Sequence, residues 1–378
     1  MENKRDEEKY LKDLLLKVCE NGHLSAESSF SVSELYNSNY PYLGKSKVTI
    51  LRRRTLVELL KAYLNSVQIG EVVDIGCGNL ELLELLRDSG LAINGEIIGI
   101  DPVPRTEIPQ GVKFINGFFH PELAPINLSE FPTLAVLDNV LEHILELRNF
   151  ISQISTWLRH GDYILICVPS YEAMVKNEQF EEITHEHSNY FTLASLIDLF
   201  VEFGFENLES CSEMIDSRGY NFHLFRKFSE KNERRHLNSS LLHGALKIRP
   251  NDLEIEEIEP HIENDFFNLL NNFQLKLVDS FPEGFSEDVY GVGASELTPI
   301  LAYYMNDDFG NLQTIFDSTP SKMGKLMPGI RPRISSWEML ENLSRDSNLF
   351  ICAPSVSKQI STNLRNKGFK NIWLPKVS

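Results

Sequence analysis

The sequence of 378 residues has few cysteines, and they form no recognisable pair or cluster. The five are scattered along the chain, without a C-x-x-C motif: Cys19, Cys77, Cys167, Cys211 and Cys352. This dispersed, odd-numbered set argues against a disulfide framework and against a cysteine-based zinc site. It is typical of reduced thiols in the cytosol, so we expect a cytoplasmic protein.

The chain also lacks long apolar runs and has a deficit of basic residues. No run approaches the ~20 apolar residues that span a bilayer, and the charged start MENKRDEEK is unlike a signal peptide. We therefore expect no membrane segment. Lys and Arg number 36 against 54 Asp and Glu, which gives a net charge of −18. Such a field repels polyanions, so nucleic acid is not expected as a partner, whereas small anionic substrates remain open. No pattern indicates an oligomeric state.

The length suggests two or three domains, and we divide the chain at residues 65, 228 and 282. Residues 1–65 are predicted to form a helical N-terminal cap, with an amphipathic helix through Leu11 and Val18 and a second helix over 51–64. The segment between these helices contains Tyr40, Tyr42 and Lys45, and it is either a solvated connector or a loop that faces a ligand.

Strand and helix patterns alternate in residues 66–228, which predicts a doubly wound, mostly parallel sheet. Residues 229–282 read as a linker and a helix, and residues 283–378 repeat the pattern as a second, smaller Rossmann-like α/β domain. The predicted strands are 72–75, 97–100, 134–137, 163–168, 208–214, 222–225, 289–292, 314–316, 349–352 and 371–374, and the predicted helices are 80–88, 150–158, 193–203 and 256–280.

A glycine turn follows the strand at 72–75. Gly76 and Gly78 let the backbone turn sharply and approach a ligand, and Asp101 ends the next strand, where a carboxylate can accept both hydroxyls of a ribose. A dinucleotide fold would need a third glycine at position 81, which is Glu81. An acidic neighbourhood opposes a pyrophosphate but suits a cation. The pattern therefore favours a sulfonium cofactor over a dinucleotide.

Three stretches in this region match one family in order. They are Asp74-Ile75-Gly76-Cys77-Gly78, Ile98-Gly99-Ile100-Asp101 and Leu137-Asp138-Asn139-Val140-Leu141-Glu142-His143. The run resembles class I S-adenosylmethionine-dependent methyltransferases. This resemblance implies S-adenosylmethionine as cofactor and the following cofactor-binding residues: Asp74, Gly76, Cys77, Gly78, Asp101, Pro102, Gly117, Phe118, Phe119 and Asn139. We interpret His143 as a structural histidine on the following helix.

Segments further along the chain resemble a narrower group, the sugar C-methyltransferases. The matching segments are 168–172, 177–180, 185–192, 290–295 and 317–329. That family methylates a carbon beside the ketone of a nucleotide-linked keto-deoxysugar. The resemblance implies that His187 is the base that removes the α-proton, that Glu186 is its acidic partner, and that His185 orients a neighbour. A histidine with a pKa near ~6.5 suits this role at neutral pH; the alternatives are structural histidines or, less favoured, metal ligands.

The chain departs from that family at several places, among them Thr184, residues 217–221 and residues 294–296. Thr184 occupies the position of a tyrosine before the His-Glu-His element, and the family's N-terminal zinc module is absent because no cysteine cluster could build it. No third and fourth ligand stand at a suitable spacing from the two histidines, so no metal is expected. Further anion-binding candidates are Lys47, Arg52 to Arg54 and Lys325; the predicted substrate-binding residues are Tyr40, Tyr42, Lys45, Arg218 and Asn221.

These observations lead to one functional hypothesis and two rivals. The first is C-methylation of a nucleotide-linked keto-deoxysugar in polysaccharide or natural-product biosynthesis, in a cleft between the two α/β domains. A second is methylation of a hydroxyl or amine on a sugar or another small molecule. A third is a non-catalytic binding protein built on a methyltransferase fold.

Overall fold

The chain folds into two compact units. The computed structural model describes residues 14–18, 23–28, 47–122, 130–215, 218–228, 262–278, 289–295 and 297–375. The first unit takes its residues from Leu15–Met174 and His185–Pro260, and the second from Val175–Thr184 and His261–Ser378. The short segment Val175–Thr184 thus leaves the first unit, whereas the predicted boundaries divide the chain into consecutive pieces.

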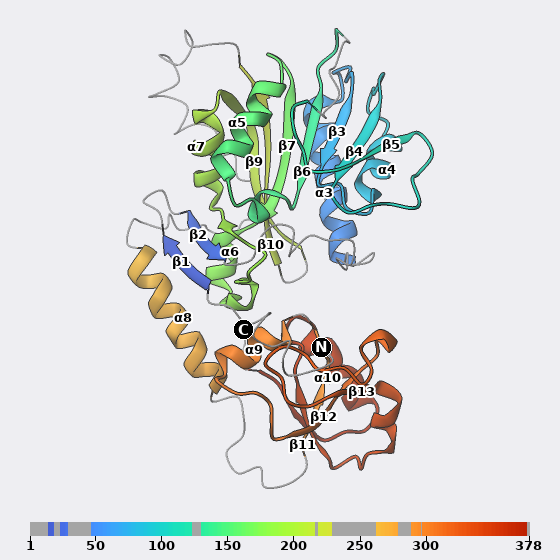
Figure 1. Cartoon of the computed structure of the whole chain (residues 1–378), viewed down its shortest axis with the longest axis vertical. Helices are drawn as coiled ribbons and strands as arrows, with labels where there is room; N and C mark the ends of the chain where they lie inside the picture. Colours follow the sequence, from blue (N-terminus) through green and yellow to red (C-terminus); the bar gives the residue numbers. More distant parts are fainter. Residues whose placement is uncertain are drawn as a thin grey trace. The chain divides into compact units, whose positions relative to one another are not determined.

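The first unit contains a seven-stranded sheet with the order β5-β4-β3-β6-β7-β10-β9 (Figure 1). The first five strands are parallel, and β10 runs antiparallel to both β7 and β9. In chain order the parallel strands read 3-2-1-4-5, as in a doubly wound fold, so their carboxyl ends share one edge. The strands are β3 (Val72–Ile75), β4 (Ile97–Asp101), β5 (Val112–Asn116), β6 (Leu134–Asp138), β7 (Tyr163–Pro169), β9 (Phe205–Ile215) and β10 (Arg218–Lys227).

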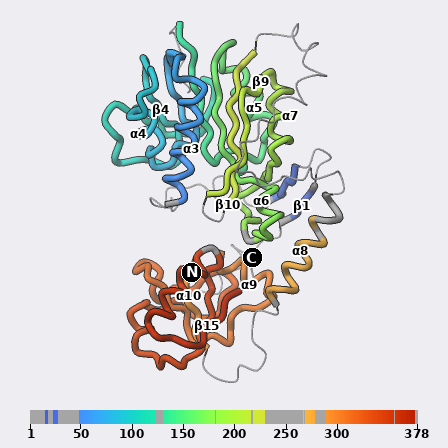
Figure 2. The backbone as a smooth tube through the Cα atoms, turned by 180° about the vertical axis from the view of Figure 1, so that it is seen from behind, coloured from blue at the N-terminus to red at the C-terminus, as the bar shows by residue number. Residues whose placement is uncertain are grey.

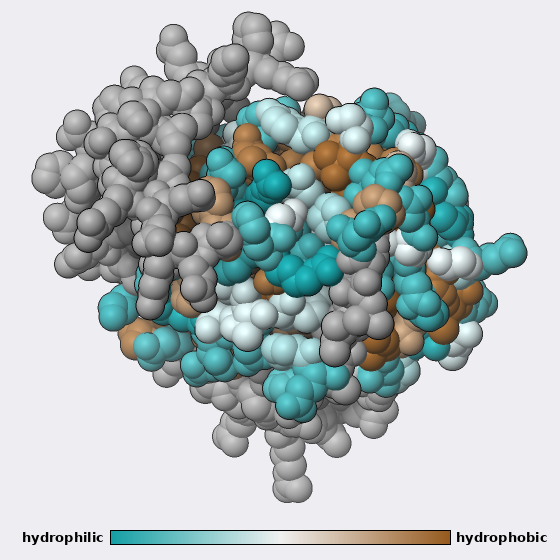
Figure 3. Space-filling model, turned by 90° about the horizontal axis from the view of Figure 1, so that it is seen from above, coloured by the Kyte–Doolittle hydropathy of each residue, from teal (hydrophilic) through white to brown (hydrophobic). Residues whose placement is uncertain are grey.

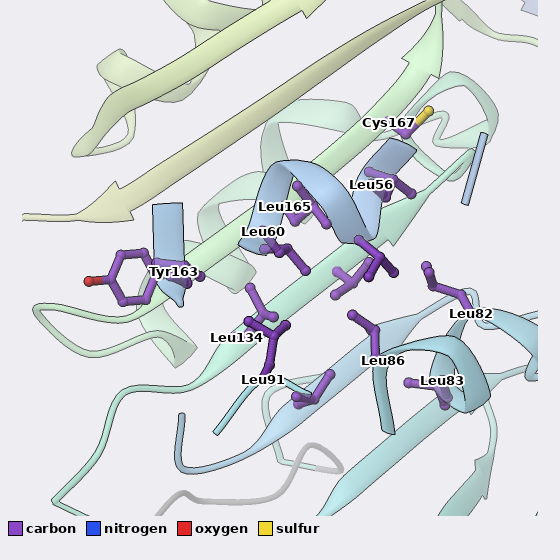
Figure 4. Packing of buried hydrophobic residues seen from close by; sticks show 14 of the residues in the cluster. Leu56, Leu60, Leu82, Leu83, Leu86, Leu91, Leu134, Tyr163, Leu165 and Cys167 are labelled. Carbon is purple, nitrogen blue, oxygen red and sulfur yellow. The ribbon is translucent and has the colours of Figure 1, made fainter. Parts of the chain in front are cut away.

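Helices cover both faces of this sheet (Figures 1 and 2). Successive strand residues point to opposite faces, and each face therefore has its own core. One core packs against α3 (Lys47–Leu64) and α4 (Glu81–Arg87), where Leu60, Leu86 and Leu134 meet (Figure 4). The other packs against α5 (Leu147–Trp157) and α7 (Leu193–Glu202). Burial on both faces explains why β3, β4 and β6 read as continuous apolar runs.

The N-terminal residues correct one prediction. Residues expected in an amphipathic helix instead form the strand β1 (Leu14–Val18), which lies beside β2 (Leu24–Ser28) in a three-stranded sheet with β8 (Asn189–Tyr190). The N–H of Ala26 donates to the carbonyl of Ser188 at 2.9 Å. Pairing with distant residues fixes this conformation, so the local apolar spacing was a poor guide. The second predicted helix is present as α3.

The second unit contains a five-stranded parallel sheet with the order β13-β12-β11-β14-β15. Its strands also read 3-2-1-4-5 in chain order. They are β11 (Val289–Val292), β12 (Leu312–Asp317), β13 (Ile334–Ser336), β14 (Asn348–Ile351) and β15 (Asn371–Trp373), and the helices of this unit are α8 (Ile262–Val278), α9 (Thr298–Tyr304) and α10 (Ser357–Asn366).

A cluster of aromatic side chains joins the segment Val175–Thr184 to the rest of the second unit. Phe180, in the 3₁₀ helix η3 (Phe180–Glu182), packs edge-on against Phe266 and Phe273 of α8. The Tyr304 hydroxyl of α9 donates to the Phe180 carbonyl at 3.0 Å. These buried contacts explain why this segment belongs to the second unit.

Most predicted strands and helices are confirmed to within a few residues, but several elements were missed. The missed elements include β5, β13, α6 (Tyr171–Lys176) and α10, as well as β2 and β8 of the three-stranded sheet. In β5 only Val112 is fully buried, so its hydrophobic pattern is weak. The remaining short elements are η2 (Leu141–His143), η4 (Pro320–Lys322), η5 (Trp337–Asn342) and η6 (Pro354–Val356). The predicted linker falls largely on residues 229–261, outside the described part of the chain.

The described helices contain no segment that is long and apolar enough to cross a membrane. On the face seen in Figure 3, hydrophilic residues cover most of the coloured surface, and hydrophobic residues form separate patches.

Replacement of Leu60 in α3 tests the core under the first sheet. Leu60 is fully buried, so Leu60→Ala is expected to lower the free energy of unfolding by about 2–5 kcal/mol in urea denaturation. Leu51→Ala in the same helix is the matched control. Leu51 is 37% exposed, and we expect a loss of about 1 kcal/mol or less. Equal losses would contradict this packing.

Candidate functional site

The glycine turn after β3 has a backbone that side chains would disturb. Gly76 has φ +74° and Gly78 has φ +53°, both in the left-handed region that glycine adopts without strain. A Cβ atom at Gly76 would lie 2.6 Å from Cγ2 of Val140. Glycine at position 76 therefore permits the turn to lie close to the segment that follows β6.

The carboxylate of Asp101, at the end of β4, holds this turn. One oxygen accepts the N–H of Gly78 at 3.0 Å, and the other accepts the N–H of Val103 at 2.9 Å. Arg105 donates from Nε to the Gly78 carbonyl at 2.6 Å, and its Nη2 lies 3.7 Å from Asp101 Oδ1. The predicted pair of turn and carboxylate therefore lies together. Each carboxylate oxygen can accept more than one hydrogen bond, so the ribose role remains open to Asp101.

Buried side-chain oxygens of Asp74 and Asn139, near the ends of β3 and β6, lack hydrogen bonds to the part of the chain that the structure describes. Within the described residues, Oδ1 of Asp74 in β3 and Oδ1 of Asn139 after β6 are buried without a hydrogen-bond partner. Asn139 also has φ +57°, an uncommon conformation that is often found at functional sites. Buried acceptors without partners are costly. They fit a ligand that brings hydrogen-bond donors and positive charge, as the ammonium and sulfonium groups of S-adenosylmethionine do.

The electrostatics of Asp74 agree with a cationic ligand. Burial, followed by the neighbouring Asp138 carboxylate, raises the pKa of Asp74 well above its usual value. A cation bound nearby would stabilise the charged form of this carboxyl. Among the residues at this edge, Asp74, Asp101 and Asn139 therefore suit S-adenosylmethionine.

The other predicted cofactor residues divide into exposed and packed groups. Gly117 follows β5 and donates its N–H to the Asp101 carbonyl at 3.0 Å, and Phe118 beside it is 54% exposed. Phe119 instead packs against Phe150 and Trp157. The side chain of Cys77 is also unavailable to a ligand, because it lies in the core under α3 and α4.

Cys77 can thus contact a ligand only through its backbone. Burial raises the pKa of its thiol well above the usual range. Pro102, directly after Asp101, is half-buried, and its carbonyl accepts the side-chain amide of Asn116 at 3.0 Å.

Two arginines of α3 were predicted as candidates for anion binding, and the structure corrects this prediction. Arg52 and Arg53 are buried and both lie 3.0 Å from the carboxylate of Asp138 at the end of β6. Arg53 also lies 2.6 Å from Glu81. Burial disfavours the charge of Asp138, but the two guanidinium groups outweigh it and lower the pKa of this carboxyl. These arginines therefore neutralise the acidic strand edge; only Arg54 of the three is exposed.

The histidines of the two motifs meet in the structure. The ring centroids of His143, in η2, and His187 are 4.9 Å apart. Nδ1 of His143 lies 2.9 Å from the carbonyl of Glu186. The N–H of Ser188 donates to the carbonyl of Glu142 at 2.7 Å. This network holds the segment around His187 against η2, which begins two residues after Asn139.

Burial shifts the titration of both η2 side chains. It raises the pKa of Glu142 to about 8 and lowers the pKa of His143 to about 4, so both groups favour their neutral forms. The site residues predicted from the sequence did not include Glu142. A charged residue between Leu141 and His143 in an apolar stretch was the available signal, but burial could not be inferred from it.

The remaining predicted site residues have different positions. Thr184, His185, Glu186 and Arg218 are half-buried, and each has interaction partners. Asn221 is a correction, because it is fully buried and accepts the Ser212 hydroxyl at 2.6 Å. Its amide nitrogen is 3.4 Å from both Glu172 Oε2 and the Phe191 carbonyl. It serves the interior of the sheet rather than a substrate. Three predicted substrate residues lie outside the described part of the chain: Tyr40, Tyr42 and Lys45.

Residues 46–210 match the model of a protein family described as a methyltransferase domain. The matched region covers less than half of the chain and contains the glycine turn, Asp101, Asn139 and His187. Together with the site geometry, this match supports an S-adenosylmethionine-dependent methyltransferase of class I.

A curated relative is the C-methyltransferase NovU from Streptomyces niveus, which is 27% identical over 176 residues. The alignment covers 44% of this chain and spans only 40% of the length of that relative.

Two solved structures also resemble this chain. One is a 1,6-didemethyltoxoflavin-N1-methyltransferase from Burkholderia thailandensis with bound S-adenosylhomocysteine, 17% identical, covering 47% of this chain and 78% of that one at a TM-score of 0.37. The other is an S-adenosylmethionine-dependent methyltransferase from Mesorhizobium loti, 12% identical, covering 45% of this chain and 96% of that one at 0.36. With such TM-scores, neither likeness bears on the assignment.

Substitution of Gly76 tests the cofactor site. Gly76→Ala is expected to weaken S-adenosylmethionine binding at least about tenfold, or about 1.4 kcal/mol, because the new Cβ pushes the turn away from Val140. Isothermal titration calorimetry measures the affinity. Gly90→Ala is the control, because Gly90 has a similar φ of +84° with no atom within 4 Å of an added Cβ. Equal affinities for the two variants would argue against this site.

Removal of Arg53 tests the buried charge network. Arg53→Ala removes a positive charge that compensates the buried carboxylates of Glu81 and Asp138. We therefore expect a loss of about 3–5 kcal/mol in the free energy of unfolding. Arg54→Ala, one residue along the same helix but exposed, is expected to change it by about 0.5 kcal/mol or less. Urea denaturation compares the two variants, and similar stabilities would refute a stabilising role for the network.

Proposed function

We propose that this chain is a C-methyltransferase that acts on a nucleotide-linked keto-deoxysugar, with His187 as the base. The observation that carries the proposal is the position of His187 against η2. This short helix begins two residues after Asn139 in the chain. An imidazole at this position lies beside the strand edge where the methyl donor is expected. The partial match to a C-methyltransferase supports carbon as the methylated atom.

The chemistry requires the removal of a proton from a carbon next to a ketone. His187 accepts this proton, and the electron pair of the broken C–H bond forms an enolate. S-adenosylmethionine, when bound, supplies an electrophilic methyl group on a positively charged sulfur. With its electron pair, the enolate carbon would take this methyl group as the methyl leaves the sulfur, and the proton on His187 would pass to solvent. Asp74, Asp101 and Asn139 would hold the cofactor, while the fixed segment around His187 orients the base.

The polar surroundings of His187 support its role as a base. His143 lies against it and is kept neutral by burial, so it places no competing positive charge beside His187. A neighbouring cation would lower the proton affinity of the base. Glu186 contributes its backbone carbonyl to the orientation of His143. We therefore assign Glu186 and His143 to positioning, and His187 to proton transfer.

A second candidate is methylation of a hydroxyl or amine on a sugar or another small molecule. Thr184 favours it, because the family's tyrosine at this position could stabilise an enolate and a threonine is a poorer substitute. Asn221 adds to this, because its burial removes a predicted substrate contact. Only carbon methylation requires removal of the α-proton, so uptake of deuterium from the solvent at the α-carbon separates the two reactions.

Substitution of His187 tests the proposed base. His187→Ala is expected to lower turnover by about 10²–10⁴-fold, while calorimetry shows S-adenosylmethionine affinity close to that of the unmodified chain. The assay uses methyl-labelled S-adenosylmethionine with a panel of nucleotide-linked keto-sugars, and reads the labelled atom by mass spectrometry and NMR.

The control variant is His160→Ala, which alters an exposed histidine of the same unit. It should retain turnover. Label on an oxygen or nitrogen, without deuterium at the α-carbon, would favour the second candidate. Unchanged turnover in His187→Ala would remove His187 as the base.

A further inference from the structure

The carboxyl of Glu142 is buried without a hydrogen bond. Glu142 is 1% exposed, and within the described residues neither carboxyl oxygen has a hydrogen-bond partner. Its Oε1 lies 3.8 Å from Nε2 of His143. A carboxyl in this environment is destabilising unless a partner compensates it, and the proposed proton transfer does not use it. The side chain therefore points to a ligand that the reaction itself does not explain.

His143 presents the nitrogen that a metal ion would need. A carbonyl oxygen only accepts hydrogen bonds, so the contact with the Glu186 carbonyl places the proton of the neutral ring on Nδ1. Nε2 then carries the lone pair and faces Glu142. Histidines that bind metals usually donate their other N–H to a carbonyl or carboxylate in this way. The backbone of the His187 segment thus fixes His143 in the ligating form.

His187 completes a group of three. Potential ligand atoms of Glu142, His143 and His187 all lie within 4.8 Å of one another. Two imidazole nitrogens and one carboxylate oxygen match the preferences of zinc and other first-row transition ions, whereas Mg²⁺ and Ca²⁺ prefer oxygen ligands alone. Glu142 and His143 are far from His187 in the sequence, so spacing could not indicate this group.

We propose that Glu142, His143 and His187 bind one divalent transition-metal ion of the zinc class. The ion takes the lone pairs of His143 Nε2 and His187 and the carboxylate of Glu142, whose proton is released to solvent, with the remaining positions open to water. Metal and proton compete for the same imidazole, so the bound ion holds the methyltransferase inactive. This inhibition rests on the proposed function, because that function makes His187 the base.

Metal binding is measured on the whole chain after treatment with EDTA and dialysis. Co²⁺ serves as the spectroscopic probe, and we expect one equivalent to produce visible d–d absorption that Zn²⁺ abolishes by displacement. Glu142→Gln and His143→Gln should each weaken Co²⁺ at least about tenfold. His160→Ala should bind as the unmodified chain does. Calorimetry with S-adenosylmethionine verifies that each variant is folded.

A second measurement shows whether His187 is a ligand. Zn²⁺ should protect His187, but not His160, from modification by diethyl pyrocarbonate, as read by peptide mass spectrometry. Absence of Co²⁺ binding, equal binding by Glu142→Gln, or modification of His187 despite saturating Zn²⁺ would each overturn the proposal.

The methyl-transfer assay separates the two proposals. If Zn²⁺ suppresses the turnover of a keto-sugar and EDTA restores it, the result supports both the proposed function and the inhibitory metal site. If Zn²⁺ leaves the turnover unchanged or increases it, the proposed inhibition is overturned. Co²⁺ binding and His187 protection without carbon methylation of any keto-sugar would remove the proposed function, while the metal site itself stands.

Discussion

The hydrogen bonds from the backbone to the Asp101 carboxylate fix the geometry on which the candidate site depends. Gly78 and Val103 donate to its two oxygens, so the turn after β3 and the end of β4 form one rigid edge. Arg105 ties the other side of the turn through the Gly78 carbonyl. Without these contacts the glycines would leave the turn free to adopt many conformations, and the acceptors on β3 and β6 would have no fixed counterpart.

The second sheet uses the same arrangement. Asp317, at the end of β12, accepts the N–H of Ala294 at 2.8 Å through one oxygen and that of Thr319 at 2.8 Å through the other. Lys322 donates to the carbonyl of Ala294 at 2.7 Å, as Arg105 does to Gly78. Both sheets share the order 3-2-1-4-5. A carboxylate at the end of the second strand is therefore a structural requirement of the turn in both sheets, whatever ligand it also contacts.

Local patterns predicted much of the fold because buried parallel strands and their helices leave clear signals. Residues 72–75 and 134–137 are apolar runs because helices cover both faces of the sheet. The pattern failed at residues 14–18, whose strand depends on the neighbouring β2 and its pairing with Asn189 and Tyr190. It also treated Arg52 and Arg53 as candidates for anion binding, because burial against Asp138 depends on a contact between helix and sheet that leaves no local trace.

The glycine turn, the Asp101 carboxylate at a strand end and most elements of the first sheet could be predicted from the sequence, because these features depend on neighbouring residues and on hydrophobic periodicity. The availability of individual polar side chains became clear only from the folded chain. The tertiary structure placed Asn221 in the interior, paired the arginines with Asp138, and brought Glu142 and His143 to His187. These outcomes depend on contacts between distant segments, where burial and the loss of water decide the energy of each polar group.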